Sequence, residues 1–90
     1  MLIRDEVASE GSIDEAAIYT REVIRRGMDL GAAAIILVHN HPSGDSAPSR
    51  QDIAMTRNIA DAGKKFGIAV HDHIIIGKNG FNSMRSSGLL

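Results

Sequence analysis

Residues 32–52 read AAAIILVHNHPSGDSAPSRQD, and this stretch decides the fold. Its first seven residues are a continuous apolar run between a glycine and a polar segment, which is typical of a strand buried on both faces of a sheet. Two prolines and a glycine then predict a rigid loop over residues 39–48. Ser49 opens an expected helix that reaches about Lys65 and ends at Gly67. The stretch therefore predicts a strand, a loop and a helix in immediate succession.

Upstream of this stretch, the pattern predicts a short strand over residues 2–9 and a loop over residues 10–19. A helix is expected from Thr20, its N-cap, to Gly31, its C-terminal stop. The apolar side of that helix has the 3.6-residue period of a core-facing surface. Its members are Val23, Ile24, Gly27 and Met28.

Downstream, a run rich in β-branched residues predicts a strand over residues 68–76, and residues 78–80 predict a tight turn into a short strand near residues 81–84. The core face of the preceding helix is expected to hold Met55, Ile59, Ala62 and Phe66. The predicted order is strand, helix, strand, helix, strand, strand. We therefore predict an α/β fold, with a small mixed β-sheet flanked by two helices.

Composition limits the classes of function. The chain has 90 residues, enough for one domain, and ten basic residues against eleven acidic ones. Without a basic excess, strong binding of nucleic acid by this domain alone is not expected. The absence of cysteine excludes disulfides and thiolate metal sites, so any metal must use His and carboxylate ligands. Because no long apolar segment or signal peptide is evident, we expect a cytoplasmic protein without a membrane span.

His39 and His41 stand at the C-terminal end of the predicted buried strand. Side chains two positions apart in a strand share a face, so both imidazoles can approach one metal ion. Open α/β sheets also tend to place ligands at the C-terminal ends of their strands. The pair therefore predicts half of a metal site.

Asp52 supplies the third candidate ligand. It lies three residues before Met55 and seven before Ile59, so it projects from the buried face of its helix towards the sheet. Ser49 and Asp52 also form the Ser-x-x-Asp pattern of a helix capping box, and the capping and metal-site interpretations are compatible. Two His and one carboxylate would leave a fourth position of Zn²⁺ open to water, which is typical of a catalytic zinc site.

The spacing His39-x-His41-x(7)-Ser49-x-x-Asp52 resembles the metal motif of the JAB/MPN (JAMM) metalloprotease superfamily. Four segments are similar to the bacterial RadC family within it, namely residues 38–45, 48–52, 72–77 and 88–90. The resemblance extends from about Leu2 to the last residue. It implies a JAB/MPN fold with cytidine-deaminase-like architecture, and a zinc ion held by His39, His41 and Asp52.

The resemblance also implies hydrolysis of a peptide or isopeptide bond in a protein substrate, with Ser49 assisting the bound water or stabilising the oxyanion. The family's general base is a glutamate upstream of these motifs, and we expect residues 1–90 to lack it together with the first strand and upstream region. None of the glutamates in the sequence stands in the expected context, and these are Glu6, Glu10, Glu15 and Glu22. Glu6 is the nearest candidate by position. The alternative function is a non-catalytic protein-interaction module of a DNA-repair protein with a structural or vestigial metal site. Direct DNA binding is a third, weaker hypothesis.

Two further interpretations concern His71 and His73 and the edge of the sheet. The histidines form a second His-x-His in a strand, where they would share a face. A second metal site is one interpretation, and a supporting role for Asp72 or His73 behind the first site is the other. If the first strand of the family is absent, an open sheet edge favours pairing between two copies of the chain.

Overall fold

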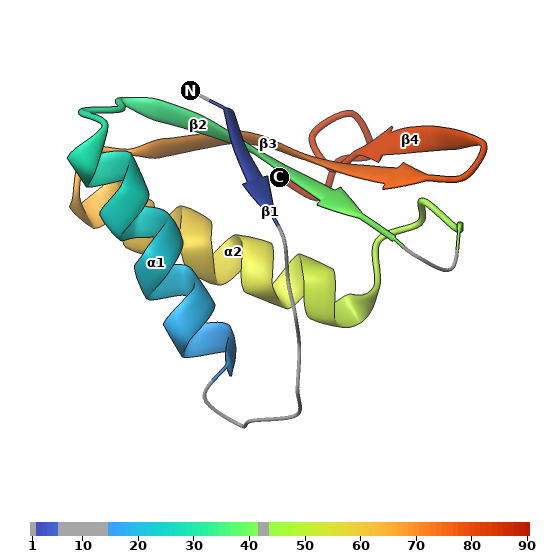
Figure 1. Ribbon diagram of the computed structural model, residues 1–90, viewed down its shortest axis with the longest axis horizontal. Helices are drawn as coiled ribbons and strands as arrows, with labels where there is room; N and C mark the ends of the chain where they lie inside the picture. The colour runs from blue at the N-terminus through green and yellow to red at the C-terminus, as the bar shows by residue number, and fades with distance from the viewer. Residues whose placement is uncertain (1, 6–14, 42–43) are drawn as a thin grey trace.

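The computed structural model describes residues 2–5, 15–41 and 44–90. Its elements alternate as the sequence predicts (Figure 1). In chain order they are β1 (Leu2–Asp5), α1 (Glu15–Asp29), β2 (Ala34–Asn40), α2 (Arg50–Lys65), β3 (Ala69–Gly77) and β4 (Gly80–Ser83). The predicted α/β class and mixed sheet are confirmed.

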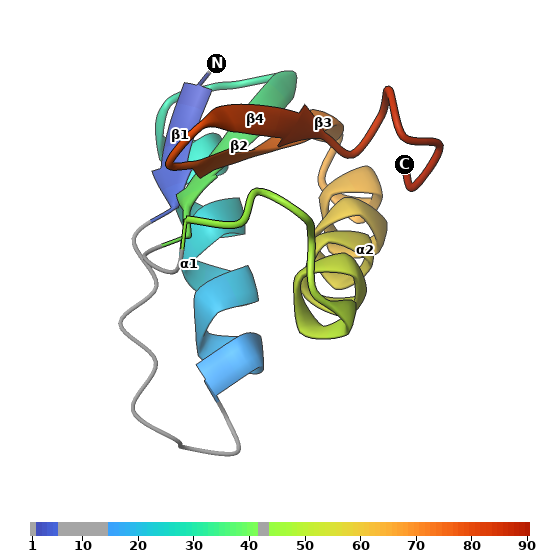
Figure 2. The same ribbon diagram turned by 90° about the vertical axis from the view of Figure 1, so that its right-hand side faces the viewer.

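The four strands form one sheet in the order β1-β2-β3-β4. β1, β2 and β3 are parallel, and β4 returns antiparallel to β3 through a tight turn. Crossovers between parallel strands are almost always right-handed, and here both run in the same direction across the sheet. Both helices therefore cover the same face, as Figures 1 and 2 show. β1 and β4 lie at the two edges of this sheet, and the pairing of copies through an edge stays a prediction.

The core lies between the helices and the inner face of β2 and β3. Ile35, Leu37 and Ile59 are fully buried there. The outward-facing residues of β2, Ile36 and Val38, are only partly buried. The prediction of a strand buried on both faces was therefore wrong, because the two helices pack on one side of the sheet. Among the described residues, no helix is long and apolar enough to cross a membrane.

α1 differs from its prediction at its start and in the exposure of Met28. It begins at Glu15, so Thr20 lies inside the helix and is not its N-cap. The described part of the predicted loop over residues 10–19 is therefore helical, and residues 6–14 lie outside the described residues. Val23 and Ile24 are buried as expected, but Met28 is 53% exposed because it lies where α1 faces a groove beside α2. Gly31 follows the helix with φ of 65°, which confirms it as the stop.

α2 begins and ends almost as predicted. Ser49 is its N-cap, and Gly67 adopts φ of 73° just beyond its end. Met55 and Ala62 pack against the core around Ile59. Phe66, expected on this face, is 56% exposed because it is the C-cap residue, where the chain leaves the helical path.

β3 contains a bulge that separates His71 from His73. In the register with β2, Val70 pairs with Ile35 and Asp72 with Ile36, so His71 is the extra residue. His71 is exposed, whereas His73 is 2% exposed and points into the core. The expectation that the two histidines share a face was wrong, because the bulge breaks the alternation of side chains.

The Asp72 carboxylate holds this bulge against the C-terminal segment. It accepts hydrogen bonds from the backbone N–H of His73 at 2.7 Å and of Arg85 at 3.0 Å, and from the Ser83 hydroxyl at 2.5 Å. Burial opposes ionisation of the Asp72 carboxyl, but these hydrogen bonds outweigh it and lower its pKa below the usual value. Asp72 therefore has a structural role, because it connects the bulge in β3 to residues 83 and 85.

Candidate metal centre

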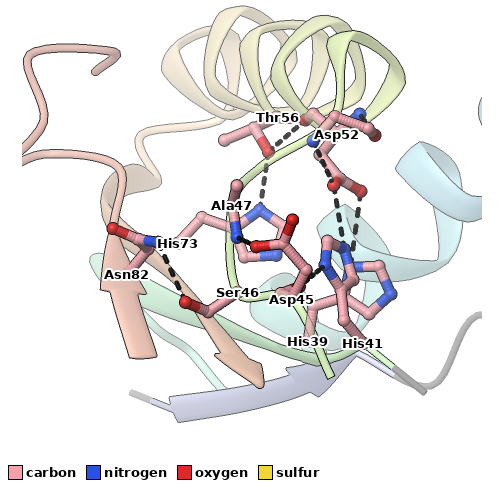
Figure 3. Close-up of polar contacts among 10 residues, drawn as sticks. His39, His41, Asp45, Ser46, Ala47, Asp52, Thr56, His73 and Asn82 are labelled. Carbon is pink, nitrogen blue, oxygen red and sulfur yellow. Dashed lines mark hydrogen bonds and ion pairs between the residues drawn. The ribbon is translucent and has the colours of Figure 1, made fainter. Parts of the chain in front are cut away.

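Three side chains converge where β2 ends and α2 begins. His39 is the second-last residue of β2, His41 follows that strand, and Asp52 is in the first turn of α2. The His39 and His41 rings lie edge to face with centroids 4.8 Å apart. Each of the three residues offers one potential ligand atom, and these atoms all lie within 4.8 Å of one another (Figure 3). The three residues that the sequence predicts as metal ligands are therefore together and could hold a metal ion.

The Asp52 carboxylate lies between the two imidazoles. Its Oδ1 is 3.4 Å from His39 Nδ1, and its Oδ2 is 3.0 Å from His41 Nε2. Burial alone would raise the pKa of this carboxyl, but hydrogen bonds from Ser49 and the two neighbouring rings outweigh burial and hold the pKa below its usual value. Asp52 is therefore ionised at neutral pH and offers an anionic oxygen as a potential ligand.

Ser49 connects this carboxylate to the start of α2. Its backbone N–H donates to Asp52 Oδ2 at 2.8 Å, and its Oγ accepts from the Asp52 backbone N–H at 3.0 Å. The capping box is therefore present, and it orients the carboxylate that points at the histidines. Among the contacts of the described residues, the Ser49 hydroxyl oxygen accepts in the cap, and its hydrogen can be donated to another oxygen. The catalytic role of Ser49 stays a prediction.

His41 provides the test of whether a cation fits this site. Its Nδ1 lies 2.7 Å from the backbone carbonyl of Asp45, which can only accept, so Nδ1 carries a hydrogen. Its Nε2 faces the Asp52 carboxylate, which is also an acceptor. Such a ring must either carry both hydrogens or share a cation with the carboxylate. A carbonyl that receives Nδ1–H and leaves Nε2 for the metal is the usual support of a metal-binding histidine.

The loop after β2 is fixed to the β3–β4 hairpin. The His41 N–H donates to the Ile76 carbonyl and the Lys78 N–H donates to the Gly44 carbonyl, each at 2.9 Å. Asn82 on β4 adds a hydrogen bond from its side chain to Ser46 at 3.0 Å (Figure 3). His41 and residues 44–46 are therefore held against the hairpin by hydrogen bonds.

Gly77 makes this close approach feasible. A Cβ built on Gly77 would lie 2.4 Å from the Gly44 carbonyl oxygen and 2.8 Å from the Ser46 nitrogen. Only a glycine fits at that distance from another backbone. The sequence pattern did not lead to a prediction of this role. A glycine directly after an apolar strand was nevertheless a signal, because strand glycines often mark the close approach of another backbone.

In the described part of the chain, no glutamate belongs to this cluster. Glu22 is exposed on α1, and Glu15 is the first residue of that helix. Glu6 and Glu10 lie outside the described residues. Within residues 2–5, 15–41 and 44–90, the group of potential ligands consists of His39, His41 and Asp52, without a glutamate. His71 and His73 do not form a second such group in these ranges.

The family model described as the RadC-like JAB domain matches residues 1–89. The chain belongs to this family. The match covers the strand end, loop and helix start that carry the three candidate ligands of this RadC-like JAB domain. The resemblance seen in the sequence motifs is therefore confirmed, and the candidate metal centre lies within the matched region.

Proposed function

We propose that this RadC-like JAB domain is a zinc-dependent hydrolase that cleaves peptide or isopeptide bonds in a protein substrate. The single observation that carries the proposal is the convergence of His39, His41 and Asp52 within 4.8 Å. The family match supports the same metal site. The activity, the zinc and the substrate are the proposed parts.

The donor set favours zinc among divalent metals. Two imidazole nitrogens and one carboxylate oxygen suit Zn²⁺, which takes bonds of about 2.0–2.1 Å to such atoms. Ligand atoms of a tetrahedral zinc therefore lie about 3.3 Å apart, and the N···O separations of 3.0 and 3.4 Å bracket that value. These two separations involve different oxygens of Asp52, and the three potential ligand atoms lie within 4.8 Å of one another, so binding would require the side chains to close around the ion. When bound, zinc would supply Lewis-acid polarisation of a carbonyl and a lowered pKa for water.

The groups beside the ligands would stabilise the negative charge that develops on the substrate. Ser49 is exposed beside Asp52, at the N-terminus of α2. Its hydroxyl hydrogen can be donated to an oxygen that becomes negative during attack on a carbonyl. The positive end of the α2 dipole acts in the same direction. Ser49 is therefore proposed as the oxyanion-stabilising group.

A second function is favoured by the absence of a glutamate from the cluster in the described ranges. Without a general base, the site would bind metal but support little turnover. The domain would then be a non-catalytic protein-interaction module, with a structural or vestigial metal, in a protein of DNA repair.

Zinc stoichiometry tests the metal site directly. We expect one zinc per chain for the wild type, measured by elemental analysis after dialysis, and strongly reduced zinc for His41→Ala. His71→Ala is the matched control, because His71 is exposed on the bulge and does not belong to the cluster. Equal zinc contents of the wild type and His41→Ala would refute the proposed ligand set.

Hydrolysis assays then separate the two functions. Peptide and isopeptide substrates are incubated with the zinc-loaded chain, with Ser49→Ala and with the chelator-treated protein. Turnover that requires zinc and falls in Ser49→Ala supports the hydrolase. Bound zinc without turnover supports the non-catalytic module. Turnover that survives removal of zinc would contradict both.

A further inference from the structure

Behind the metal ligands lie two buried polar residues that the proposed chemistry does not use. Thr56 on α2 is 1% exposed and His73 on β3 is 2% exposed. Thr56 lies one helical turn after Asp52, and His73 lies beside the ring of His39. Figure 3 shows Thr56 between Asp52 and His73. The pair therefore links α2, which carries Asp52, to a ring on β3 that stacks on His39 of β2.

The hydrogen bonds in this pair have a defined direction. Thr56 Oγ1 is 2.7 Å from the Asp52 carbonyl oxygen, which can only accept, so the hydroxyl hydrogen is donated there. The same Oγ1 is 2.6 Å from His73 Nδ1. With its one hydrogen already used, Thr56 must accept this second bond. His73 Nδ1 therefore carries a hydrogen, which sets the tautomer of the ring.

His73 also contacts a ligand ring directly. Its imidazole stacks on that of His39, with centroids 6.0 Å apart and planes at 29°. It thus touches one ligand on β2 and, through Thr56, the backbone of another ligand on α2. The distance between His39 and Asp52 depends on how the first turn of α2 sits on the sheet, and His73 and Thr56 occupy that contact.

We propose that Thr56 and His73 are positioning residues of the metal site, which hold Asp52 at the correct spacing from His39. They act through two consecutive hydrogen bonds: His73 Nδ1–H donates to Thr56 Oγ1, and the Thr56 hydroxyl donates to the Asp52 carbonyl oxygen. Removal of the Thr56 hydroxyl leaves His73 Nδ1–H without this acceptor in a buried place. The first turn of α2 then loses its hydrogen-bonded attachment to β3, and the Asp52 carboxylate is no longer held for the metal.

The electrostatics agree with this geometry. Burial is the largest influence on His73 and, with the nearby His39, lowers its pKa to about 4. The ring is therefore neutral at pH 7, and it can stack beside a metal-binding histidine without adding positive charge. The proposal itself stands on the contacts of Thr56 and His73.

The test compares Thr56→Val, Thr56→Ser and a control, Thr20→Val, in the 90-residue chain; it rests on the proposed zinc site. Thr20 is a half-buried threonine on α1 that lines the groove beside α2 and does not belong to the ligand cluster. Zinc affinity is measured by competition with a chromophoric chelator, and the Co²⁺ spectrum reports ligand geometry. We expect Thr56→Val to bind zinc about 10–100-fold more weakly and to show a changed Co²⁺ spectrum, as is usual when the support of a ligand is lost. Thr56→Ser and Thr20→Val should stay within about threefold of the wild type.

The tautomer of His73 gives a readout that needs neither metal nor a variant. In ¹⁵N spectra of the metal-free wild type, the hydrogen of His73 should be on Nδ1. A hydrogen on Nε2 would overturn the hydrogen-bond chain even if Thr56→Val failed to fold.

The affinities distinguish the two proposals. Wild-type zinc affinity in Thr56→Val, or equal losses in Thr56→Val and Thr56→Ser, would overturn the positioning role and leave the zinc site standing. Absence of zinc binding by the wild type would overturn the proposed function and the positioning role with it.

Discussion

Gly77→Ala should damage the metal site from a position that contacts none of the ligands. The new Cβ would lie 2.4 Å from the Gly44 carbonyl oxygen. Ordinary van der Waals contact begins at 3.4 Å, so the two atoms would be 1.0 Å too close. Both groups belong to backbone, so neither can rotate away. The loop over residues 44–48 must therefore move by a distance of that order, relative to the β3–β4 hairpin.

This displacement has two expected costs. Overpacking of a close contact typically costs about 1–3 kcal/mol in the free energy of unfolding, and the hydrogen bond from Lys78 N–H to the same oxygen is strained as well. In a domain of this size, a loss of about 2 kcal/mol lowers Tm by roughly 8–16 °C. The moved loop also carries the Asp45 carbonyl that orients His41. Zinc affinity should therefore fall about 10–100-fold.

Gly80→Ala is the matched control for this experiment. It makes the same substitution in the same hairpin, but its Cβ would meet nothing within 4 Å, and Gly80 has no positive φ. Thermal unfolding of the metal-free proteins and chelator competition for zinc are measured for both variants. If Gly77→Ala matches Gly80→Ala in Tm and in zinc affinity, the reasoning from close backbone approach is refuted.

Three more predictions follow from contacts elsewhere in the fold. Gly63→Ala should lower the free energy of unfolding in urea by about 1–3 kcal/mol, because its Cβ would lie 2.5 Å from the Ile68 carbonyl oxygen; an unchanged urea midpoint would contradict this. Asp72→Ala leaves three hydrogen-bond donors without their acceptor and should cost about 1–3 kcal/mol in the same assay, and a loss below a few tenths would remove its structural role. The pKa of His73 is lowered from 6.5 to about 4 in the folded protein. Between these pH values the unfolded chain therefore binds more protons than the folded chain. The contribution of neutral His73 to stability is full above pH 6.5 and falls as pH drops towards 4. Urea titrations of metal-free protein should show up to roughly 3 kcal/mol of this loss in the wild type and a smaller one in His73→Gln, whereas equal pH slopes would argue against it.

Local patterns were enough for much of the fold and for the ligand set. The apolar run before His39 predicted a strand, and the strand brings His39 and His41 to the same place. The position of Asp52 relative to Ile59 predicted that its carboxylate points inward, and the contacts with both histidines confirm this. These predictions succeeded because they depend on periods of two and 3.6 residues, which the sequence carries by itself.

Predictions failed where the environment of an element decides the outcome. Phe66 belongs to the apolar period of α2, yet it is exposed because the helix ends there. His71 alternates with His73 in the sequence, but the bulge in β3 turns it to solvent. Thr56 was not considered as part of the site, although it lies four residues after Asp52 on the same side of the helix. Periodicity indicates which residues share a face, but it does not indicate what the face will meet.

The sequence by itself determined the order of elements, the identity of the three candidate ligands and the cap that orients one of them. Each of these depends on residues within one helix, one strand or one loop. Only the tertiary structure decided that His73 and Thr56 support the site and that Gly77 admits the loop, since these contacts join residues 17 or more positions apart. The candidate metal site thus has potential ligands that are specified by local sequence. Their spacing is specified by packing, because the side chains between β2 and α2 fix the distance between these two elements.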